Sequence, residues 1–510
     1  MNVVRSMRID HWLSETQKKY PQKTAIIFKG KNWTFTKLNI LISETSSFLQ
    51  NQCKLKTGDR FCFYGLNNPE QIILLFAASK IGAIIFPINW RLANPEIEYQ
   101  IKNSKPKLIF YDPRFENNLE NLNINRLIKK ISIKKTIKTK NNLSDERKNK
   151  SQVKSLDNNN LPLLLVYTSG TTGKPKGALI SQKSIICNAK MSHDAHSLNP
   201  SDKALIFLPL FHVGGINILF LPALFIGATT VLQEKFDSAE SINNIDKYRI
   251  TQILTVPTIL DQMITHNLWD KINRNSIKVI SIGSTRVPLK LIKKLHAFKI
   301  PIIQIYGATE TGPIAIYQKA KDAFETEGSI GKAGNLCKIK LVNKDLEEVE
   351  IGCAGQILVK GDNILDGYWN DNIATKKSII DGWFLTGDMA KVDNFGNYWF
   401  VDRIKNVIIS GGENIYPAEL EIILSGHKDL KEFLVIGKND PIWGEVPVIV
   451  AVSKKENLKP ENILLFFEGK VAKYKIPKEV VFVSVIPKNA LGKIIVDDVK
   501  NLVNKDLSIK

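Results

Sequence analysis

Hydrophobic and polar positions follow two different periods along the first 125 residues. Residues 33–50 carry apolar side chains at helical spacing, whereas residues 61–66 form a short apolar run that is typical of a buried strand. A helix is then predicted over residues 71–82 and a strand over residues 83–88. Such alternation of strands and helices indicates a mainly parallel α/β sheet.

The pattern changes further along the chain. The α/β alternation resumes at Leu161 and continues to about Tyr306. Residues 328–399 contain short strand-like runs separated by Gly and Asp-Gly turns, which predicts a β-rich subdomain. A small α/β unit follows Asp402. Because 510 residues exceed what one compact core usually holds, two or more domains are expected.

Residues 129–154 consist largely of Lys, Asn, Ser and Thr, with few large apolar side chains. This composition predicts a mobile surface insertion in preference to a nucleic-acid-binding arm. The formal charge of +21 does not indicate nucleic-acid binding either. Only 11 of the 71 basic residues are arginine, the residue favoured for bidentate phosphate and base contacts. We therefore predict no nucleic-acid partner and attribute the charge to lysines on a solvated surface.

The five cysteines lie far apart without a CxxC pair, and the seven histidines show no paired spacing. A structural metal site is therefore not expected, and unclustered thiols suit a reducing compartment. The N-terminus has no apolar stretch typical of a secretory signal. The most apolar segment, residues 216–228, is too short to span a bilayer and contains Pro222. These features predict a cytoplasmic protein without a transmembrane segment.

Residues 167–177 read YTSGTTGKPKG and directly follow the apolar run 161–166. Glycines let the backbone approach a polyphosphate closely, hydroxyls donate to phosphate oxygens, and lysines offset the charge. The segment is not a Walker A loop, because proline and not Ser or Thr follows Gly173-Lys174. An ordinary Ser/Thr/Gly loop would not need two lysines after a buried strand, so we predict a phosphate-binding loop.

Three further segments carry candidate chemistry. Residues 304–311, QIYGATET, follow a predicted strand and offer a ring for a nucleobase and a carboxylate for Mg²⁺, although a turn with a helix cap fits too. Residues 381–421 contain Asp388, which suits ribose hydroxyls, and the pair Asp402-Arg403, which also fits a surface salt bridge. Residues 487–493 end in Lys493, a position that on its own predicts only a solvated lysine.

In this order, the four segments resemble the AMP-forming acyl-CoA synthetase (adenylate-forming) superfamily over about residues 10–500. The resemblance implies an α/β fold with a large N-terminal domain, residues 1–402, of stacked mainly parallel sheets with helices and a small β-rich subdomain. It also implies a small mobile α+β C-terminal domain, residues 403–510, with a hinge near Lys405.

The implied enzyme is an acid–thiol ligase that uses ATP, Mg²⁺ and coenzyme A. A carboxylate attacks the α-phosphorus of ATP to give an acyl-adenylate and pyrophosphate, and a thiol then displaces AMP. Positioning and positive charge must allow an anion to approach a polyanion. The resemblance makes Lys493, Thr168, Glu310 and Lys176 the catalytic residues. The cofactor-binding set is Thr168, Ser169, Gly170, Thr171, Thr172, Gly173, Lys176, Gly283, Tyr306, Gly307, Thr309, Asp388, Arg403, Lys405, Gly411, Gly412 and Lys493.

Within that set the resemblance assigns individual roles. Glu310 holds Mg²⁺, Tyr306 stacks on adenine and Thr309 contacts the α-phosphate. Asp388 and Arg403 fix the ribose. Lys493 bridges the carboxylate and the α-phosphate and leaves when the C-terminal domain rotates. Residues 410–412 then line the pantetheine path, but Ile409 and Gly411 stand where some relatives carry lysines, so contacts from those lysines are not carried over.

The implied substrate positions are His212, Gly214, Gly215 and Ser284. His212 lies in FLPLFHVGGIN, residues 207–217, at the family position that gates the acyl tunnel, although a packed loop histidine is the alternative. The two glycines are expected to leave room beside it, which favours a medium- or long-chain fatty acid. Arg286 either pairs with a second substrate carboxylate or faces solvent. An aryl or dicarboxylic acid, such as o-succinylbenzoate, is therefore the alternative.

Other functions stay open on the sequence alone. The acceptor is a separate carrier protein in one alternative, and a luciferase-like oxygenase is another. A non-catalytic sensor of nucleotides or acyl-adenylates is disfavoured because Lys493, Glu310 and Lys176 are all present. The expected partners are a small carboxylic acid, ATP and CoA, and a homodimer is left open.

Overall fold

The computed structural model describes residues 8–133, 159–168, 175–284, 287–410, 413–488 and 494–506. The chain divides into two compact units: Met1–Ile339 with Val359–Leu385, and Lys340–Leu358 with Thr386–Lys510. The expected boundary at 402/403 falls inside the second unit, so a mobile domain that begins there stays a prediction. Within the described ranges, the helices are too short or too polar to cross a membrane.

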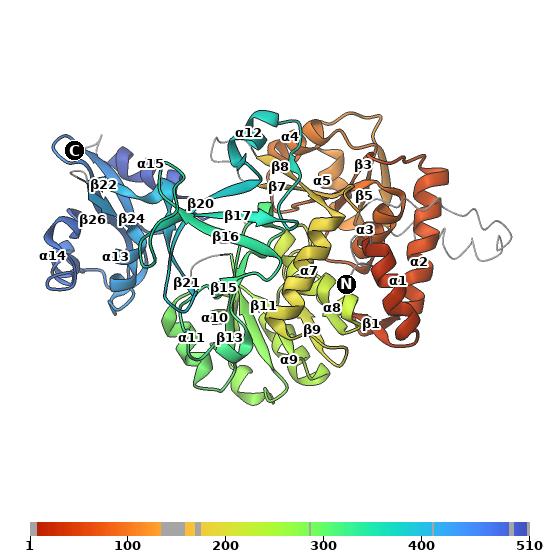
Figure 1. The fold of residues 1–510 in the computed structure, drawn as a ribbon, viewed down its shortest axis with the longest axis horizontal. Coiled ribbons are helices and arrows are strands. Elements are labelled where there is room, and N and C mark those ends of the chain that lie inside the picture. The colour runs from red at the N-terminus through yellow and green to blue at the C-terminus, as the bar shows by residue number, and fades with distance from the viewer. Residues whose placement is uncertain are drawn as a thin grey trace. The chain divides into compact units, whose positions relative to one another are not determined.

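The first unit contains a seven-stranded sheet in the order β18-β8-β7-β4-β3-β5-β6. Figure 1 labels four of these strands, β3, β5, β7 and β8. Strands β3 to β7 run parallel, whereas β8 is antiparallel to β7 and β18 is antiparallel to β8. The strands are β3 (Arg60–Tyr64), β4 (Ile84–Ile88), β5 (Leu108–Tyr111), β6 (Lys129–Ser132), β7 (Pro162–Thr168), β8 (Lys176–Ser181) and β18 (Gly367–Tyr368).

A second sheet of nine strands has the order β15-β14-β13-β12-β11-β9-β10-β1-β2. Its six central strands, from β13 to β1, are parallel, and the outer strands are antiparallel. The strands are β1 (Thr24–Phe28), β2 (Lys31–Thr34), β9 (Lys203–Ile206), β10 (Thr229–Leu232), β11 (Gln252–Thr255), β12 (Val279–Ile282), β13 (Ile302–Tyr306), β14 (Ile316–Tyr317) and β15 (Lys332–Ala333).

Alternating side chains of the strands enter different cores. Phe61 and Phe63 join a central core that contains residues of both sheets, whereas Cys62 and Tyr64 face an outer core. Because successive side chains of a strand point to opposite faces, both faces are buried and the strands are apolar throughout. Helices of the central core include α1 (Ile9–Lys19), α2 (Phe35–Ser47), α3 (Pro69–Ile81), α7 (Gln182–His196) and α8 (Leu221–Ile226).

The outer helices cover the other face of each sheet. The seven-stranded sheet packs against α4 (Asn94–Ser104) and α5 (Glu116–Glu120), and the nine-stranded sheet packs against α9 (Ser238–Tyr248), α10 (Pro257–Ile264) and α11 (Leu289–His296) (Figure 1). Helix α3 is buried on every side except at Lys80. Its ends follow ordinary capping chemistry: Asn68 accepts from the N–H of Glu70, and Gly82 closes the helix at φ 72°.

Two five-stranded sheets complete the fold. One has the order β16-β17-β20-β19 with β21 paired to β20, and the other has the order β23-β22-β25-β24 with β26 paired to β25. The strands are β16 (Cys337–Val342), β17 (Gly355–Gly361), β19 (Ile379–Ile380), β20 (Trp383–Val392), β21 (Tyr398–Arg403), β22 (Ile408–Ser410), β23 (Glu413–Ile415), β24 (Leu430–Asp440), β25 (Gly444–Ser453) and β26 (Glu479–Phe482). The remaining α-helices of the described residues are α12 (Asn372–Ser378), α13 (Pro417–Leu424), α14 (Pro460–Leu465) and α15 (Val496–Asp506).

The predicted fold class is confirmed, with two local corrections. The helix expected over 33–50 starts only at Phe35, because Thr34 ends strand β2 and its hydroxyl accepts from the N–H of Lys37. The expected mobile insertion is wrong for residues 129–132, which form β6 parallel to β5. Lysine side chains at the edge of a sheet stay in solvent, so a basic segment still forms a strand. The rest of the expected insertion lies largely in residues 134–158, outside the described ranges.

Truncation of the buried helix α3 tests this layered core. Leu74→Ala is expected to lower the free energy of unfolding by about 2–5 kcal/mol, because the side chain is 1% exposed and leaves a cavity. Leu127→Ala makes the same chemical change at a side chain that is 90% exposed and is expected to stay within about 0.5 kcal/mol. Urea unfolding of both variants checks the difference, and equal midpoints would contradict the proposed core.

Candidate active site

Two neighbouring parallel strands of the nine-stranded sheet bring predicted nucleotide residues to one edge. Strand β12 ends at Ile282, which pairs with Gln304 of β13, so Gly283 and Tyr306 follow at the same carboxyl edge. This edge is where ligands bind in open α/β sheets. A Cβ at Gly283 would lie 2.9 Å from the carbonyl oxygen of Ile305, which explains the glycine. Ser284 next to it has a left-handed φ of 72°.

The turn after β13 holds Glu310 in a short 3-10 helix, Thr309–Thr311. Gly307 is required at its start, because a Cβ there would lie 1.8 Å from the carbonyl oxygen of Pro313. The hydroxyl of Thr311 accepts from the N–H of Ala308 at 2.9 Å. These constraints fix the backbone on both sides of Glu310.

Three buried asparagines bracket the far side of this turn. Asn188 of α7 accepts from the N–H of Ile314 at 2.9 Å, and Asn217 donates to the carbonyl of Gly312 at 3.0 Å. Asn363 donates to the carbonyls of Thr311 at 3.0 Å and Ile314 at 2.9 Å. Among the described residues, the Oδ1 atoms of Asn217 and Asn363 are buried without a donor. The hydrogen bonds that the three asparagines make hold the backbone of residues 311–314 in place.

Hydroxyls from two strands of the seven-stranded sheet converge on the Glu310 carboxylate. Thr168, at the end of β7, donates to Oε1 at 3.4 Å, and Tyr368 of β18 donates to the same oxygen at 3.0 Å. Lys176 begins β8 opposite Thr168, and its Nζ lies 5.3 Å from the centroid of the Tyr368 ring. The structure therefore brings together Thr168, Lys176 and Glu310, three residues that the sequence placed in one site.

The second unit places the predicted ribose residues side by side. Asp388 and Arg403 are paired across β20 and β21, and Arg403 Nε lies 3.0 Å from Asp388 Oδ1. Asp402 instead accepts hydrogen bonds from the N–H of Arg403 and, at 2.9 Å, from that of Ala418 at the start of α13. Lys405 is exposed in the turn Ile404–Asn406 that follows β21.

Matches to family models and to relatives identify the family of this chain. The AMP-binding enzyme model matches residues 13–369, and the AMP-binding enzyme C-terminal domain model matches residues 419–493. The chain belongs to the AMP-binding enzyme family. It is 40% identical to the indoleacetate–CoA ligase of Aromatoleum aromaticum over 98% of both chains. It is 30% identical to the feruloyl-CoA synthase of an Amycolatopsis species, with 98% of this chain and 99% of that chain covered.

A solved structure gives the same answer. The o-succinylbenzoate coenzyme A synthetase (MenE) from Bacillus subtilis, in complex with ATP and magnesium ion, aligns with a TM-score of 0.85 and 28% identity, covering 96% of this chain and 99% of that chain. The resemblance to AMP-forming acyl-CoA synthetases is thus confirmed, and the protein is an acid–thiol ligase. ATP, Mg²⁺ and CoA fit this family of ligases.

The donor set around Glu310 suits Mg²⁺ in the enzyme. Within the described ranges, no three His, Cys, Asp or Glu side chains gather as a metal cage. Mg²⁺ does not need such a cage, because it keeps several waters and is usually bound by one or two carboxylates together with substrate phosphates. Glu310, already bonded at Oε1 by two hydroxyls, is a carboxylate of this kind.

The segment around His212 corrects one sequence inference. Gly215 does not leave room for substrate, because a Cβ there would lie 2.2 Å from the carbonyl oxygen of Pro209. Close packing at the start of a π-helix, Gly214–Phe220, explains this glycine. The N–H of Gly214 donates to Nδ1 of His212 at 3.1 Å, so the imidazole is oriented by its own loop.

Several predicted residues lie outside the described ranges: Ser169, Gly170, Thr171, Thr172, Gly173, Arg286, Gly411, Gly412 and Lys493. Sequence reasoning, in turn, missed Tyr368 and the three bracketing asparagines. The tripeptide Gly367-Tyr368-Trp369 was the available signal, because an aromatic pair after a glycine stands out in the β-rich region. The asparagines gave no signal, since each is isolated in sequence.

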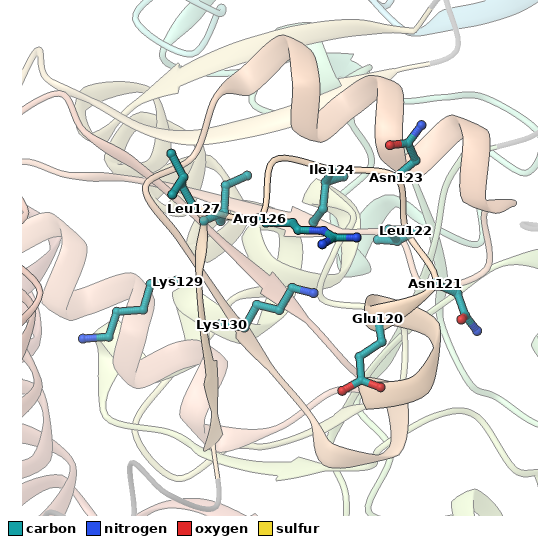
Figure 2. Close-up of a pocket in the computed structure, with 10 residues that line it drawn as sticks. Glu120, Asn121, Leu122, Asn123, Ile124, Arg126, Leu127, Lys129 and Lys130 are labelled. Atoms are coloured by element: carbon teal, nitrogen blue, oxygen red, sulfur yellow. The ribbon is translucent and has the colours of Figure 1, made fainter.

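Figure 2 shows a surface hollow of about 730 Å³. Its lining comes from the segment that runs from the end of α5 into the start of β6: Glu120, Asn121, Leu122, Asn123, Ile124, Arg126, Leu127, Ile128, Lys129 and Lys130. Its lining contains no predicted site residue. The hollow therefore does not mark the active site.

The asparagine bracket can be tested by removing Asn363. Asn363→Ala leaves two buried carbonyls without their donor, which is expected to lower the free energy of unfolding by about 1–3 kcal/mol. Displacement of Glu310 is expected to lower adenylation about 10- to 100-fold. Urea unfolding and pyrophosphate release measure the two effects. Asn117→Ala, at an exposed helical position, is the control, and an Asn363→Ala variant with wild-type adenylation would contradict the positioning role.

Proposed function

We propose that this enzyme activates an aryl-substituted carboxylic acid to its acyl-adenylate and then transfers the acyl group to coenzyme A. The observation that carries the adenylation step is the convergence of Thr168 and Tyr368 on Glu310 beside Lys176. This carboxylate is held by hydroxyls next to an ammonium group, at the carboxyl edges of parallel strands. Such a site is suited to a nucleoside triphosphate with its cation.

In the first step, a substrate carboxylate oxygen attacks the α-phosphorus of ATP. The new bond joins that oxygen to phosphorus, and the bond from the α-phosphorus to the bridging oxygen breaks, so pyrophosphate leaves with the electron pair. Lys176 and Lys493 would offset the charge of the two anions, and the hydroxyls of Ser169, Thr171 and Thr172 would donate to phosphate oxygens. Mg²⁺, when bound at Glu310, would supply further charge neutralisation.

Residues at the sheet edge would hold the nucleotide during this step. Tyr306 would lie against adenine, with Gly283 and Gly307 allowing close backbone approach. Thr309 would donate to the α-phosphate. Asp388 and Arg403 would hold the ribose, and their 3.0 Å ion pair supports this role because it fixes both side chains before the nucleotide arrives.

In the second step, the thiol sulfur of CoA attacks the acyl carbon. The carbon–sulfur bond forms, the carbon–oxygen bond to AMP breaks, and the thiol proton goes to solvent or base. This step needs the nucleotide retained while Lys493 withdraws, which a domain rotation near Lys405 would achieve. Gly411 and Gly412 would then line the path of the pantetheine chain.

The proposal also names the class of carboxylic acid that the enzyme activates. The relatives act, by their names, on indoleacetate, ferulate and o-succinylbenzoate, which are all aromatic acids. These names favour the aryl alternative over the medium- or long-chain fatty acid that the sequence led us to expect. The packing of Gly215 removes one argument for a long aliphatic chain. His212 and Ser284 remain the proposed substrate contacts, while a cytoplasmic location and a homodimer stay predictions.

A pyrophosphate-release screen tests the activity and the substrate class together. The panel contains indole-3-acetate, ferulate, o-succinylbenzoate, octanoate, palmitate and malonate, each with and without CoA. We expect the highest kcat/KM with an aryl acid and CoA-dependent formation of a thioester. A higher kcat/KM for octanoate or palmitate would contradict the aryl proposal. Failure to release pyrophosphate with every acid would contradict the ligase itself.

The role of Lys493 is tested by separating the half-reactions. Lys493→Ala is expected to slow pyrophosphate release about 10²- to 10³-fold, the usual loss when a charge-stabilising donor is removed. Transfer from preformed acyl-AMP to CoA should be largely spared, because the lysine has withdrawn in that step. Lys488→Ala, a nearby lysine that pairs with Glu432 at 2.8 Å, is the control. Equal losses in both half-reactions would overturn the two-state account.

A further inference from the structure

A five-residue segment, residues 365–369, connects the Glu310 turn to strand β8. The N–H of Leu365 donates to the carbonyl of Glu310 at 2.8 Å. The N–H groups of Asp366 and Trp369 donate to the carbonyls of Leu179 at 2.9 Å and Gly177 at 2.7 Å. The segment therefore bonds the backbone of Glu310 at one end and the backbone of strand β8, just after Lys176, along the rest of its length.

Tyr368 is the side chain in this segment that contacts both charged groups. It is 9% exposed, its hydroxyl donates to Glu310 Oε1 at 3.0 Å, and its ring lies 5.3 Å from Lys176 Nζ. Burial first, and then the Glu310 charge, raises the pKa of Tyr368. A hydroxyl that donates to a carboxylate makes its ring richer in electrons, which strengthens the attraction for an ammonium group.

We infer that Tyr368 is a positioning residue that aims the Glu310 carboxylate at the cation of Mg·ATP and holds Lys176 toward the phosphates. The inference rests on the proposed function, because it explains how Glu310 and Lys176, two residues of that reaction, are held in position. Glu310 and Lys176 have opposite charges and come from different elements, the turn after β13 and strand β8, and Tyr368 contacts both without neutralising either. Bonds from Tyr368 and Thr168 both end on Oε1, which orients the carboxylate for a cation at its other oxygen.

A purely structural role for Tyr368 gives different expectations. Its ring packs in a small cluster with Ala178, Leu365, Ala374 and Phe384. If packing were its only function, Tyr368→Phe would keep that function, because the ring remains and only the hydroxyl is lost. The positioning role predicts instead that loss of the hydroxyl weakens the response to Mg²⁺.

The experiment compares Tyr368→Phe, Tyr368→Leu and Tyr111→Phe with the wild-type enzyme. Tyr111 is the matched control, since it is also buried and its hydroxyl bonds a carboxylate, Glu116, at 2.6 Å. The Mg²⁺ concentration for half-maximal pyrophosphate release is measured at fixed ATP. The rise in Tm on adding α,β-methylene-ATP is measured with Mg²⁺ and with EDTA, which gives a readout independent of turnover.

For Tyr368→Phe we expect about a tenfold higher half-saturating Mg²⁺ concentration, which corresponds to the loss of one hydrogen bond to a charged group. Most of the Mg²⁺-dependent Tm rise should disappear. Tyr368→Leu should also raise the KM for ATP, because Lys176 loses the ring. Tyr111→Phe should match the wild-type enzyme in both measurements.

Three results would contradict this account. They concern the Tyr368 hydroxyl, the Tyr368 ring and the proposed reaction, respectively. A Tyr368→Phe variant with wild-type Mg²⁺ dependence and Tm response would remove the role of the hydroxyl. Equal ATP KM values for the Phe and Leu variants would remove the role of the ring. A wild-type enzyme that releases no pyrophosphate would refute the proposed function, while the Tm measurements would still test Tyr368.

Discussion

The proposed site depends on a carboxylate that is correctly aimed where a polyanion would bind. Glu310 alone would repel the phosphates of ATP, so it requires a cation between them and neighbours that hold it without neutralising it. Hydroxyl donors meet this requirement, and Thr168 and Tyr368 supply two of them. A lysine paired directly with Glu310 would instead compete with the cation for the same oxygens.

The layered fold makes this arrangement possible. Thr168 and Tyr368 belong to the seven-stranded sheet, and Glu310 follows the last parallel strand of the nine-stranded sheet. The two sheets share one core with α3 and α7, which fixes them against each other. Packed interiors resist small displacements, so strand β18 of one sheet and the turn after β13 of the other keep a hydrogen-bond distance of 3.0 Å between Tyr368 and Glu310.

Buried polar side chains in this core also help to position Glu310. Asn188, Asn217 and Asn363 fix the turn that carries Glu310, although two of their oxygens have no donor among the described residues. The bonds that the three asparagines make join the turn to α7, to the π-helix Gly214–Phe220 and to residue 363, which lie far from it in sequence.

The sequence by itself determined the fold class, the family and the local chemistry of each motif, because apolar period, glycine placement and runs of hydroxyls are local properties. It also indicated that Thr168, Lys176 and Glu310 share a site, through their resemblance to one family. Only the tertiary structure showed that the Tyr368 hydroxyl bonds Glu310 and that Gly215 is packed against Pro209. It also showed that the start of the expected flexible insertion forms strand β6. These facts depend on partners that are distant in sequence or on the close approach of backbone atoms, and periodicity carries no information about either.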